Sequence, residues 1–288
     1  MLRSLTSAIS GLQSFQQRMD VIGNNVANVN TVAFKSARMG LADSFSQTLR
    51  SSSASSGTTS GTSAMQIGSG VMISAIENIY TQGALTRTGV TTDLAITGAG
   101  FFVVRDPITD STFVTRAGDF RVDENNFLVS NSGLRVQGFS DGTLTAIGDI
   151  VVDAAGMPPT SDPTATMVSF AIDIEGKVNI NLTDGTQFVR GQILMQNFSA
   201  PQGLMKEGNN LYSPIGAAGP IGGATSPRPA AAGTNGLGRI QSGALELSNV
   251  DLANEFTNLI TTQRAYQANA RIITTSDEML QELVNLKR

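Results

Sequence analysis

Residues 251–286 read DLANEFTNLITTQRAYQANARIITTSDEMLQELVNL, and this stretch decides the fold. Its apolar residues alternate at spacings of four and three, which is the repeat of a helix with one apolar seam. At 1.5 Å per residue the helix is about 50 Å long, so we expect it to stand outside any small domain. Ser248 or Asn249 is the expected N-cap. The seam runs through Leu252, Phe256, Leu259, Gln263, Tyr266, Ala270, Ile273, Asp277, Leu280 and Val284.

The opposite end of the chain carries a similar pattern. Residues 2–29 place apolar side chains such as Leu5, Leu12, Met19 and Val26 at helical spacings. Each helix alone could cover the surface of its own domain, but two such helices at opposite ends of one chain predict a paired hairpin. A lone two-helix hairpin leaves much of its apolar stripe uncovered. We therefore expect it to need further copies of itself.

The middle of the chain predicts β-structure. Short β-type runs are separated by turn signals such as Asp141-Gly142, Glu175-Gly176 and Asp184-Gly185. This spacing favours an antiparallel sandwich or irregular barrel. The expected strands are 93–97, 101–105, 112–115, 134–139, 168–174, 177–181, 188–190 and 192–197.

These patterns together predict an α+β fold. Residues 1–35 and 248–288 form a helical, coiled-coil-like inner domain from the paired terminal helices. Residues 36–75, which include the Ser/Gly/Thr-rich run 50–64, form a linker. Residues 76–247 form a central antiparallel β-rich outer domain, with a Gly/Pro/Ala-rich loop at 216–238.

Composition excludes many kinds of chemistry. The chain of 288 residues has no Cys, His or Trp, only 15% charged residues and a net charge of −4. Disulfides, thiolate nucleophiles, Cys-based zinc sites and histidine acid–base catalysis are therefore excluded. No basic cluster favours nucleic acid, and no apolar run is long enough for a membrane span. The N-terminus lacks the apolar core of a secretory signal. We expect no enzyme activity, cofactor, metal, nucleic acid or membrane span.

Three motifs resemble one known family. Residues 23–35 read GNNVANVNTVAFK, residues 93–104 read DLAITGAGFFVV with FVTRAGDFRVDENNFLV following at 113–129, and the C-terminal segment opens with GALELSNV at 243–250. They resemble, in order along nearly the whole chain, the bacterial flagellar rod and hook proteins. The resemblance implies a structural subunit whose paired terminal helices stack helically into a hollow, torque-transmitting tube. It also implies export through the flagellar type III apparatus without a cleaved signal peptide, and a place in the basal body, outside the cytoplasm.

Partners and interface residues follow from the same resemblance. The expected partners are copies of this chain, other flagellar rod and hook proteins, and the export apparatus. Asn24 and Asn28 share a helix face, where their amides could fix the register of packed helices through hydrogen bonds. Alternatively, they could simply end the helix, as Asn residues often do. The resemblance favours a role at an interface. The expected subunit-interface residues are Leu5, Ile9, Leu12, Met19, Ile22, Asn24, Asn25, Val26, Asn28, Phe34, Lys35, Leu252, Phe256, Leu259, Gln263, Tyr266, Asn269, Ile273, Leu280 and Val284.

Alternatives remain within and outside the family. The length leaves no room for the extra β domain of a typical hook protein, and residues 45–70 resemble the longer segment of distal rod proteins, which is associated with a stiff rod. The ending LQELVNLKR is closer to hook proteins, so a short hook protein is the alternative to the distal rod. Asp119, Asp123 and Glu124 could in principle serve a wall-cleaving enzyme, although their context is typical of a turn. Gly98-Ala99-Gly100 lacks the third glycine and following helix of a phosphate loop. An extracellular adhesin would carry its seam at one end of the chain.

Overall fold

The computed structural model describes residues 2–55, 60–158, 162, 164–213, 215–221, 232–233 and 236–286. The chain divides into two compact units, and each is assembled from separate stretches of sequence. Unit 1 comprises Met1–Asn28, Ser36–Ile79 and Val250–Arg288, and unit 2 comprises Val29–Lys35 and Tyr80–Asn249. The chain therefore passes between the units after Asn28, Lys35, Ile79 and Asn249.

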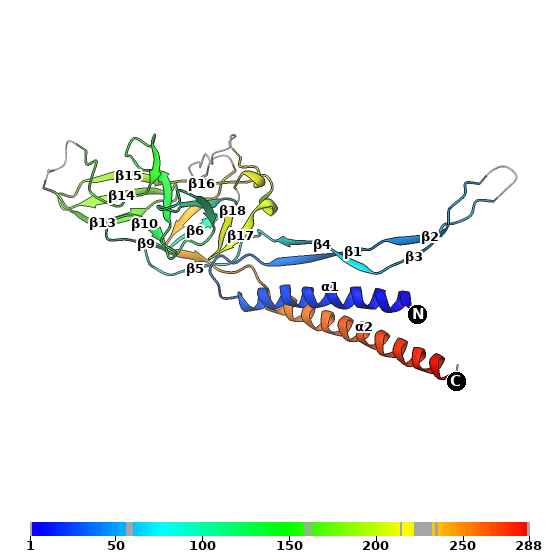
Figure 1. Ribbon diagram of the computed structural model, residues 1–288. Coiled ribbons are helices and arrows are strands. Elements are labelled where there is room, and N and C mark those ends of the chain that lie inside the picture. Colours follow the sequence, from blue (N-terminus) through cyan, green and yellow to red (C-terminus); the bar gives the residue numbers. More distant parts are fainter. Residues whose placement is uncertain are drawn as a thin grey trace. The chain divides into compact units, whose positions relative to one another are not determined.

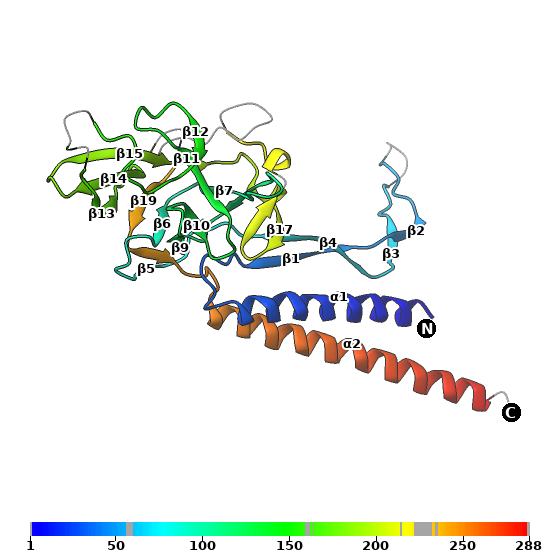
Figure 2. The same cartoon turned by 60° about the vertical axis from the view of Figure 1, so that its left-hand side comes forward.

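Unit 1 contains the two terminal helices and a long antiparallel ribbon (Figure 1). Strand β1 pairs with β4, and β2 pairs with β3. The helices lie side by side in both views, and α1 also contacts β1 and β4 (Figure 2). The elements are α1 (Leu2–Ala27), β1 (Ala37–Asp43), β2 (Ser46–Arg50), β3 (Met65–Gly68), β4 (Val71–Asn78) and α2 (Leu252–Leu286).

Specific polar contacts and one glycine hold α1 against the ribbon. The Asn25 side chain donates to the carbonyl of Ala37 at 2.8 Å and accepts from its N–H at 2.9 Å. Gly70 has a φ of +129°, and a Cβ there would lie 2.2 Å from Ser10 Oγ. Only glycine adopts this conformation at such close approach without strain. The start of β1 and the start of β4 are thus both held on α1.

Unit 2 is built on a 12-stranded antiparallel sheet. Its main strand order is β13-β14-β15-β11-β7-β8-β18-β17, with β9, β10, β12 and β16 alongside; β6 pairs with β19, and β5 pairs with β20. The strands are β5 (Leu85–Arg87), β6 (Leu94–Thr97), β7 (Phe101–Arg105), β8 (Thr112–Thr115), β9 (Phe120–Val122), β10 (Leu128–Ser130), β11 (Arg135–Phe139), β12 (Ile147–Asp149), β13 (Met167–Ile172), β14 (Lys177–Leu182), β15 (Gln187–Ile193), β16 (Met195–Gln196), β17 (Met205–Gly208), β18 (Leu211–Ser213), β19 (Arg239–Ser242) and β20 (Ala244–Glu246), with short 3-10 helices at Pro201–Gly203 and Ile215–Ala218.

Apolar residues from these strands form the core of unit 2. Phe102, Leu128, Val136 and Ile193 are fully buried in one cluster. A second cluster surrounds Phe101 and contains Tyr212. Ring edges meet ring faces here, with centroids 5.2–6.0 Å apart. Such aromatic pairs add about 0.5–1.5 kcal/mol each beyond their buried area.

The α+β class and the strand meander expected from the sequence are confirmed. The hairpin between β13 and β14 turns at Glu175-Gly176, and the next one turns at Asp184-Gly185, where Gly176 and Gly185 have φ near +80°. The segment 36–75, expected as a linker, instead contains β1–β3 and most of β4. Within the composition-biased runs, residues 56–59, 222–231 and 234–235 lie outside the described residues.

The expected cap of α2 was wrong. Asp251 caps the helix, because its Oδ1 accepts from the N–H groups of Ala253 at 2.9 Å and Asn254 at 3.4 Å. Asn249 instead donates to Thr81 within unit 2. Within the part of the chain that the structure describes, no helix combines the length and the apolar character needed to cross a membrane.

Candidate functional site

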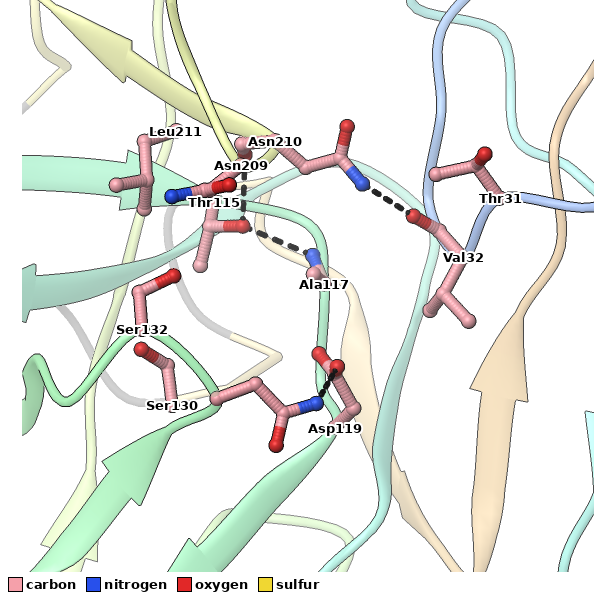
Figure 3. A pocket seen from close by; sticks show the side chains of 11 residues that line it. Thr31, Val32, Thr115, Ala117, Asp119, Ser130, Ser132, Asn209, Asn210 and Leu211 are labelled. Carbon is pink, nitrogen blue, oxygen red and sulfur yellow. Dashed lines mark hydrogen bonds between the residues drawn. The ribbon is translucent and has the colours of Figure 1, made fainter. Parts of the chain in front are cut away.

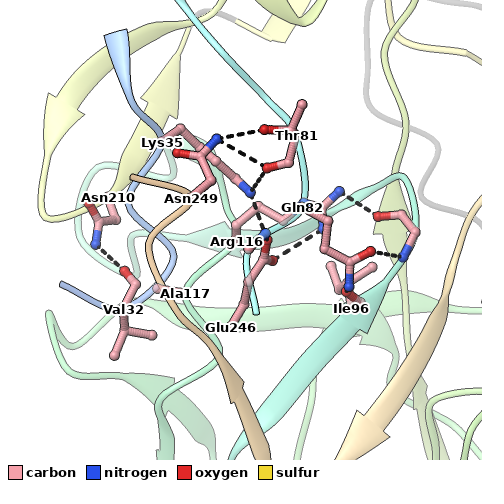
Figure 4. A network of polar contacts seen from close by, with 12 residues as sticks. Val32, Lys35, Thr81, Gln82, Ile96, Arg116, Ala117, Asn210, Glu246 and Asn249 are labelled. Atoms are coloured by element: carbon pink, nitrogen blue, oxygen red, sulfur yellow. Dashed lines mark hydrogen bonds and ion pairs between the residues drawn. The ribbon is translucent and has the colours of Figure 1, made fainter. Parts of the chain in front are cut away.

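A buried charge cluster lies in unit 2 (Figure 4). The Lys35 ammonium donates to Glu246 Oε1 at 2.7 Å, and Arg116 Nη1 lies 3.3 Å from Glu246 Oε2. The Lys35 and Glu246 side chains have no exposed surface, and that of Arg116 is 5% exposed. We call these residues the buried cluster. One carboxylate therefore serves two cations away from solvent.

Burial dominates the electrostatics of the buried cluster. It lowers the pKa of Lys35 and of Arg116, although the adjacent Glu246 carboxylate opposes this in both cases. Taking charges out of water is expensive, and a single carboxylate only partly compensates two cations. Such a cluster adds little net stability but strongly penalises the loss of any one member.

Further hydrogen bonds bring distant stretches of backbone to the buried cluster. Lys35 Nζ also donates to the carbonyl of Thr81 at 2.7 Å, and the Asn249 side chain donates to Thr81 Oγ1 at 2.9 Å. The N–H of Gly83 donates to Glu246 Oε1 at 2.9 Å. A Cβ at Gly83 would lie 2.1 Å from the Leu247 carbonyl oxygen. Glycine is required here because two backbone segments meet closely.

Residues 33–35 make further contacts within unit 2. The N–H of Ala33, at a φ of +55°, donates to the Glu246 carbonyl at 2.8 Å. Lys206 donates to the Lys35 carbonyl at 2.8 Å, and its ammonium lies 4.3 Å from the centre of the Phe34 ring. Phe34 and Lys35, both expected at a subunit interface, are buried within the subunit itself.

The buried cluster joins the three motifs singled out in the sequence. Lys35 ends the first motif, Arg116 lies in FVTRAGDF, and Glu246 lies in GALELSNV. Of the three residues of the buried cluster, only Lys35 was a candidate site residue in the sequence analysis. A lone Glu and a lone Arg in β-type segments carry no pattern that pairs them, since their partners are far away in the sequence.

The asparagines expected at an interface, Asn24, Asn25 and Asn28, have different surroundings in the structure. Asn25 is buried and bonded to β1 as described above, so its side chain acts within the subunit. Asn24 is exposed, and its side-chain and backbone oxygens accept from the Asn28 side chain at 3.0 and 2.9 Å. These two amides lie at the end of α1, which Asn residues favour.

The face that α1 turns inward differs from its apolar stripe. Its buried residues include Ala8, Gly11, Ser14 and Ile22. A Cβ on Gly11 would lie 2.6 Å from Asn269 Nδ2 of α2, so the small residues allow the helices to approach closely. Half of the expected interface residues of α1 are only partly buried, and Ile9 is 39% exposed. The partly buried ones are Leu5, Leu12, Met19 and Val26.

The line of α2 that is least exposed coincides with the predicted seam at Leu259, Tyr266, Ile273 and Leu280 and departs from it elsewhere. It runs through Glu255, Leu259, Thr262, Tyr266, Asn269, Ile273, Ser276 and Leu280, again with spacings of four and three. Thr262 and Ser276 are its most buried members, at 2% each. Their hydroxyls donate to the carbonyls of Asn258 at 2.6 Å and Ile272 at 2.7 Å. Hydrophobicity could not find them, because these polar groups are satisfied inside the helix itself.

Large apolar side chains on α2 consequently remain exposed. Phe256 and Leu252, expected at an interface, are accessible in the subunit, as are Gln263 and Val284. Six large apolar side chains of α2 have exposed fractions between 39% and 56%. We call these the α2 flanks: Leu252, Phe256, Ile260, Ile272, Met279 and Leu283. They fall into two groups, Leu252, Phe256 and Ile260 near the start of α2 and Ile272, Met279 and Leu283 further along it, and exposed apolar groups of this kind are typical of interaction sites.

A pocket of about 270 Å³ with polar and apolar lining residues also lies in unit 2 (Figure 3). Burial raises the pKa of Asp119 in its lining, and this carboxylate accepts a hydrogen bond from Asn131. Asp119 is the only carboxylate among the described lining residues. Asp123 instead accepts from the N–H groups of Asn125 and Phe127 in the turn between β9 and β10. The acid–base pair considered from the sequence is therefore not assembled in this pocket.

Comparisons with known families match three parts of the chain. Residues 5–35 match the flagella basal body rod protein family, residues 95–180 match the flagellar hook protein FlgE/F/G D1 domain, and residues 241–286 match the flagellar basal body rod FlgEFG protein C-terminal family. The first and last matches contain Lys35 and Glu246, and the second contains Arg116.

Individual relatives match over the full length. The flagellar basal-body rod protein FlgG of Bacillus subtilis is 44% identical over 288 residues, covering 100% of both chains. The flagellar hook protein FlgE of Borreliella burgdorferi is 27% identical over an alignment of 449 residues, also covering 100% of both. The crystal structure of the Helicobacter pylori hook protein FlgE2 matches 64% of this chain and 47% of that one, at 15% identity and a TM-score of 0.22.

Proposed function

The chain belongs to the family of flagellar basal-body rod and hook proteins, and from this premise we propose that it is a structural subunit of the distal rod. In this role it polymerises into a hollow tube that transmits torque and passes exported subunits. Its partners are copies of itself and the other flagellar axial proteins. The full-length identity of 44% to a basal-body rod protein supports the rod over the hook, because the hook protein that matches over its full length is only 27% identical.

One observation carries the structural role. The terminal helices pack within the subunit through small residues such as Gly11, Thr262 and Ser276, and this leaves the α2 flanks exposed. Burying apolar surface yields about 25 cal/mol per Å². A second subunit that covers the α2 flanks therefore supplies a driving force for assembly that one subunit cannot supply alone.

The ribbon of unit 1 offers a second apolar surface. Phe45 is 76% exposed, and Met65, Met72 and Ile76 are each at least half exposed. In the polymer these side chains pack on neighbouring subunits. The paired terminal helices then form a coiled-coil-like inner domain, with the β-rich unit 2 as the outer domain.

The expected interface residues divide accordingly. Those that contact other subunits are the exposed and partly buried positions of the helices, from Leu5 to Val26 in α1 and from Leu252 to Val284 in α2. Asn25, Phe34 and Lys35 act inside the subunit. Export through the flagellar type III apparatus, without a cleaved signal peptide, places the chain in the basal body outside the cytoplasm.

A labelling experiment tests the proposed function. An epitope inserted in a surface loop of unit 2 is detected by electron microscopy on isolated basal bodies, and the protein is sequenced from its N-terminus. We expect label along the distal rod and an intact N-terminal segment. Label on the hook supports the short hook protein instead, and basal bodies without label contradict an axial role.

A further inference from the structure

The buried cluster lies where the chain leaves unit 2. Three of the four passages between the units follow Lys35, Ile79 and Asn249. Lys35 itself donates to Thr81, and Asn249 donates to the same Thr81. Lys35 and Asn249 are therefore both bonded to Thr81, and Lys35 is also bonded to Glu246.

Backbone contacts strengthen the same junction. The N–H of Ala33 donates to the Glu246 carbonyl at 2.8 Å, that of Leu247 to the Ala84 carbonyl at 2.8 Å, and that of Asn249 to the Phe34 carbonyl at 3.4 Å. Each bond joins stretches that are far apart in the sequence. A force that pulls on one passage is therefore transmitted to the others through these hydrogen bonds and ion pairs, and is not carried by one backbone segment alone.

We propose that Lys35, Thr81, Arg116, Glu246 and Asn249 form a junction clamp, which fixes the spacing of the three passages and shares mechanical load among them. This rests on the proposed function, because the load is the torque carried by the rod. The five are positioning residues: they act through the segments that they hold. A buried ionic cluster suits this task because it is geometrically specific even where it adds little net stability.

A matched control separates positioning from ordinary stabilisation. Asp149, with a side chain 9% exposed, bonds Arg105 at 2.9 Å and Arg135 at 3.0 Å elsewhere in unit 2. Asp149→Asn thus also removes one carboxylate that serves two arginines. It lies at none of the chain passages, so it lowers stability without loosening the junction clamp.

The first measurement is amide hydrogen exchange on the purified full-length subunit. We expect Glu246→Gln to speed exchange at Ala33, Gly83, Leu247 and Asn249 by about tenfold or more, because local opening there becomes easier. Asp149→Asn should leave these amides at the wild-type rate. Equal exchange in the two variants overturns the proposal. If Glu246→Gln does not fold, Asn249→Ala, which removes the side-chain bonds to Thr81, is measured in its place and read in the same way.

The second measurement is swimming speed against medium viscosity in cells that carry each variant, with rods counted by electron microscopy. For cells with equal rod numbers, we expect motility of Glu246→Gln to fall more steeply with load than that of Asp149→Asn. Superimposable curves overturn the load-sharing role. If the wild-type gene itself restores no rods to a deletion strain, the proposed function fails, whereas the exchange experiment still decides whether the junction clamp exists.

Discussion

Glu246→Gln and Lys35→Met should destabilise unit 2 unequally, although they break the same ion pair. Glu246→Gln leaves Lys35 and Arg116 buried without a counter-charge, and breaking a buried pair in this way costs about 3–5 kcal/mol. Lys35→Met replaces the ammonium by an apolar chain of similar length. Glu246 then keeps Arg116 and the N–H of Gly83, so we expect about 1–3 kcal/mol.

Thermal unfolding of the purified subunit measures this difference. Tyr80 and Tyr212 both lie in unit 2, so a Tyr266→Phe background makes tyrosine fluorescence report that unit alone. At about 2–4 °C per kcal/mol for a domain of this size, Glu246→Gln should lower Tm by about 6–20 °C. A Tm loss for Lys35→Met equal to or larger than that for Glu246→Gln would refute the reasoning.

The pH dependence gives an independent check with a defined sign. Burial already lowers the pKa of Lys35 from its ordinary 10.5, and Glu246 is the group that opposes this. Without Glu246 the pKa of Lys35 falls further. When the pKa of a group is lower in the folded than in the unfolded protein, the protein is more stable above the unfolded-state pKa. That stability is lost as pH falls through the folded-state pKa. The deficit of Glu246→Gln should therefore shrink as pH rises toward 10.5; a constant deficit contradicts a buried, charged Lys35.

Three further outcomes are expected. Gly83→Ala should destabilise unit 2, because its Cβ would lie 2.1 Å from the Leu247 carbonyl oxygen, whereas Gly216→Ala has open space and should leave Tm unchanged. Leu259→Asp should abolish assembly, seen by electron microscopy, and leave the fluorescence melt of unit 2 intact, since an unpaired charge costs several kcal/mol in the helix interface. Asp149→Asn should lose less stability than the wild type as pH falls below about 4. Burial tends to raise the pKa of Asp149, but hydrogen bonds from Arg135, Gln137 and Arg105 lower it overall. The stability that ionised Asp149 contributes therefore disappears in the wild type as pH falls through that lowered pKa.

The sequence predicted the elements better than their packing. Alternation and Asp-Gly or Glu-Gly turns located β13–β15, because strand and hairpin signals are local. The ribbon β1–β4 was missed, since its Ser/Gly/Thr-rich tip has the composition of a linker and its exposed strands show little alternation. The pairing of β1 with β4 depends on partners about thirty residues or more apart, which local composition does not specify.

Sequence reasoning also predicted only part of the candidate site, because the site depends on contacts between residues that are far apart in the sequence. Apolar periodicity identified both helices but only part of the face that each turns inward. On α2 the predicted seam shares Leu259, Tyr266, Ile273 and Leu280 with the inward face, but the most buried positions there are the small polar Thr262 and Ser276, which apolar periodicity does not mark. The partners of Lys35 could not be inferred, since Arg116 and Glu246 meet it only after unit 2 has folded around all three.

Cryo-electron tomography of cells that lack this gene tests the central claim most directly. A subunit of the distal rod predicts basal bodies that stop at a short rod and carry no hook, restored by the wild-type gene. A complete rod without a hook would make the chain a short hook protein. Unchanged flagella would contradict the account.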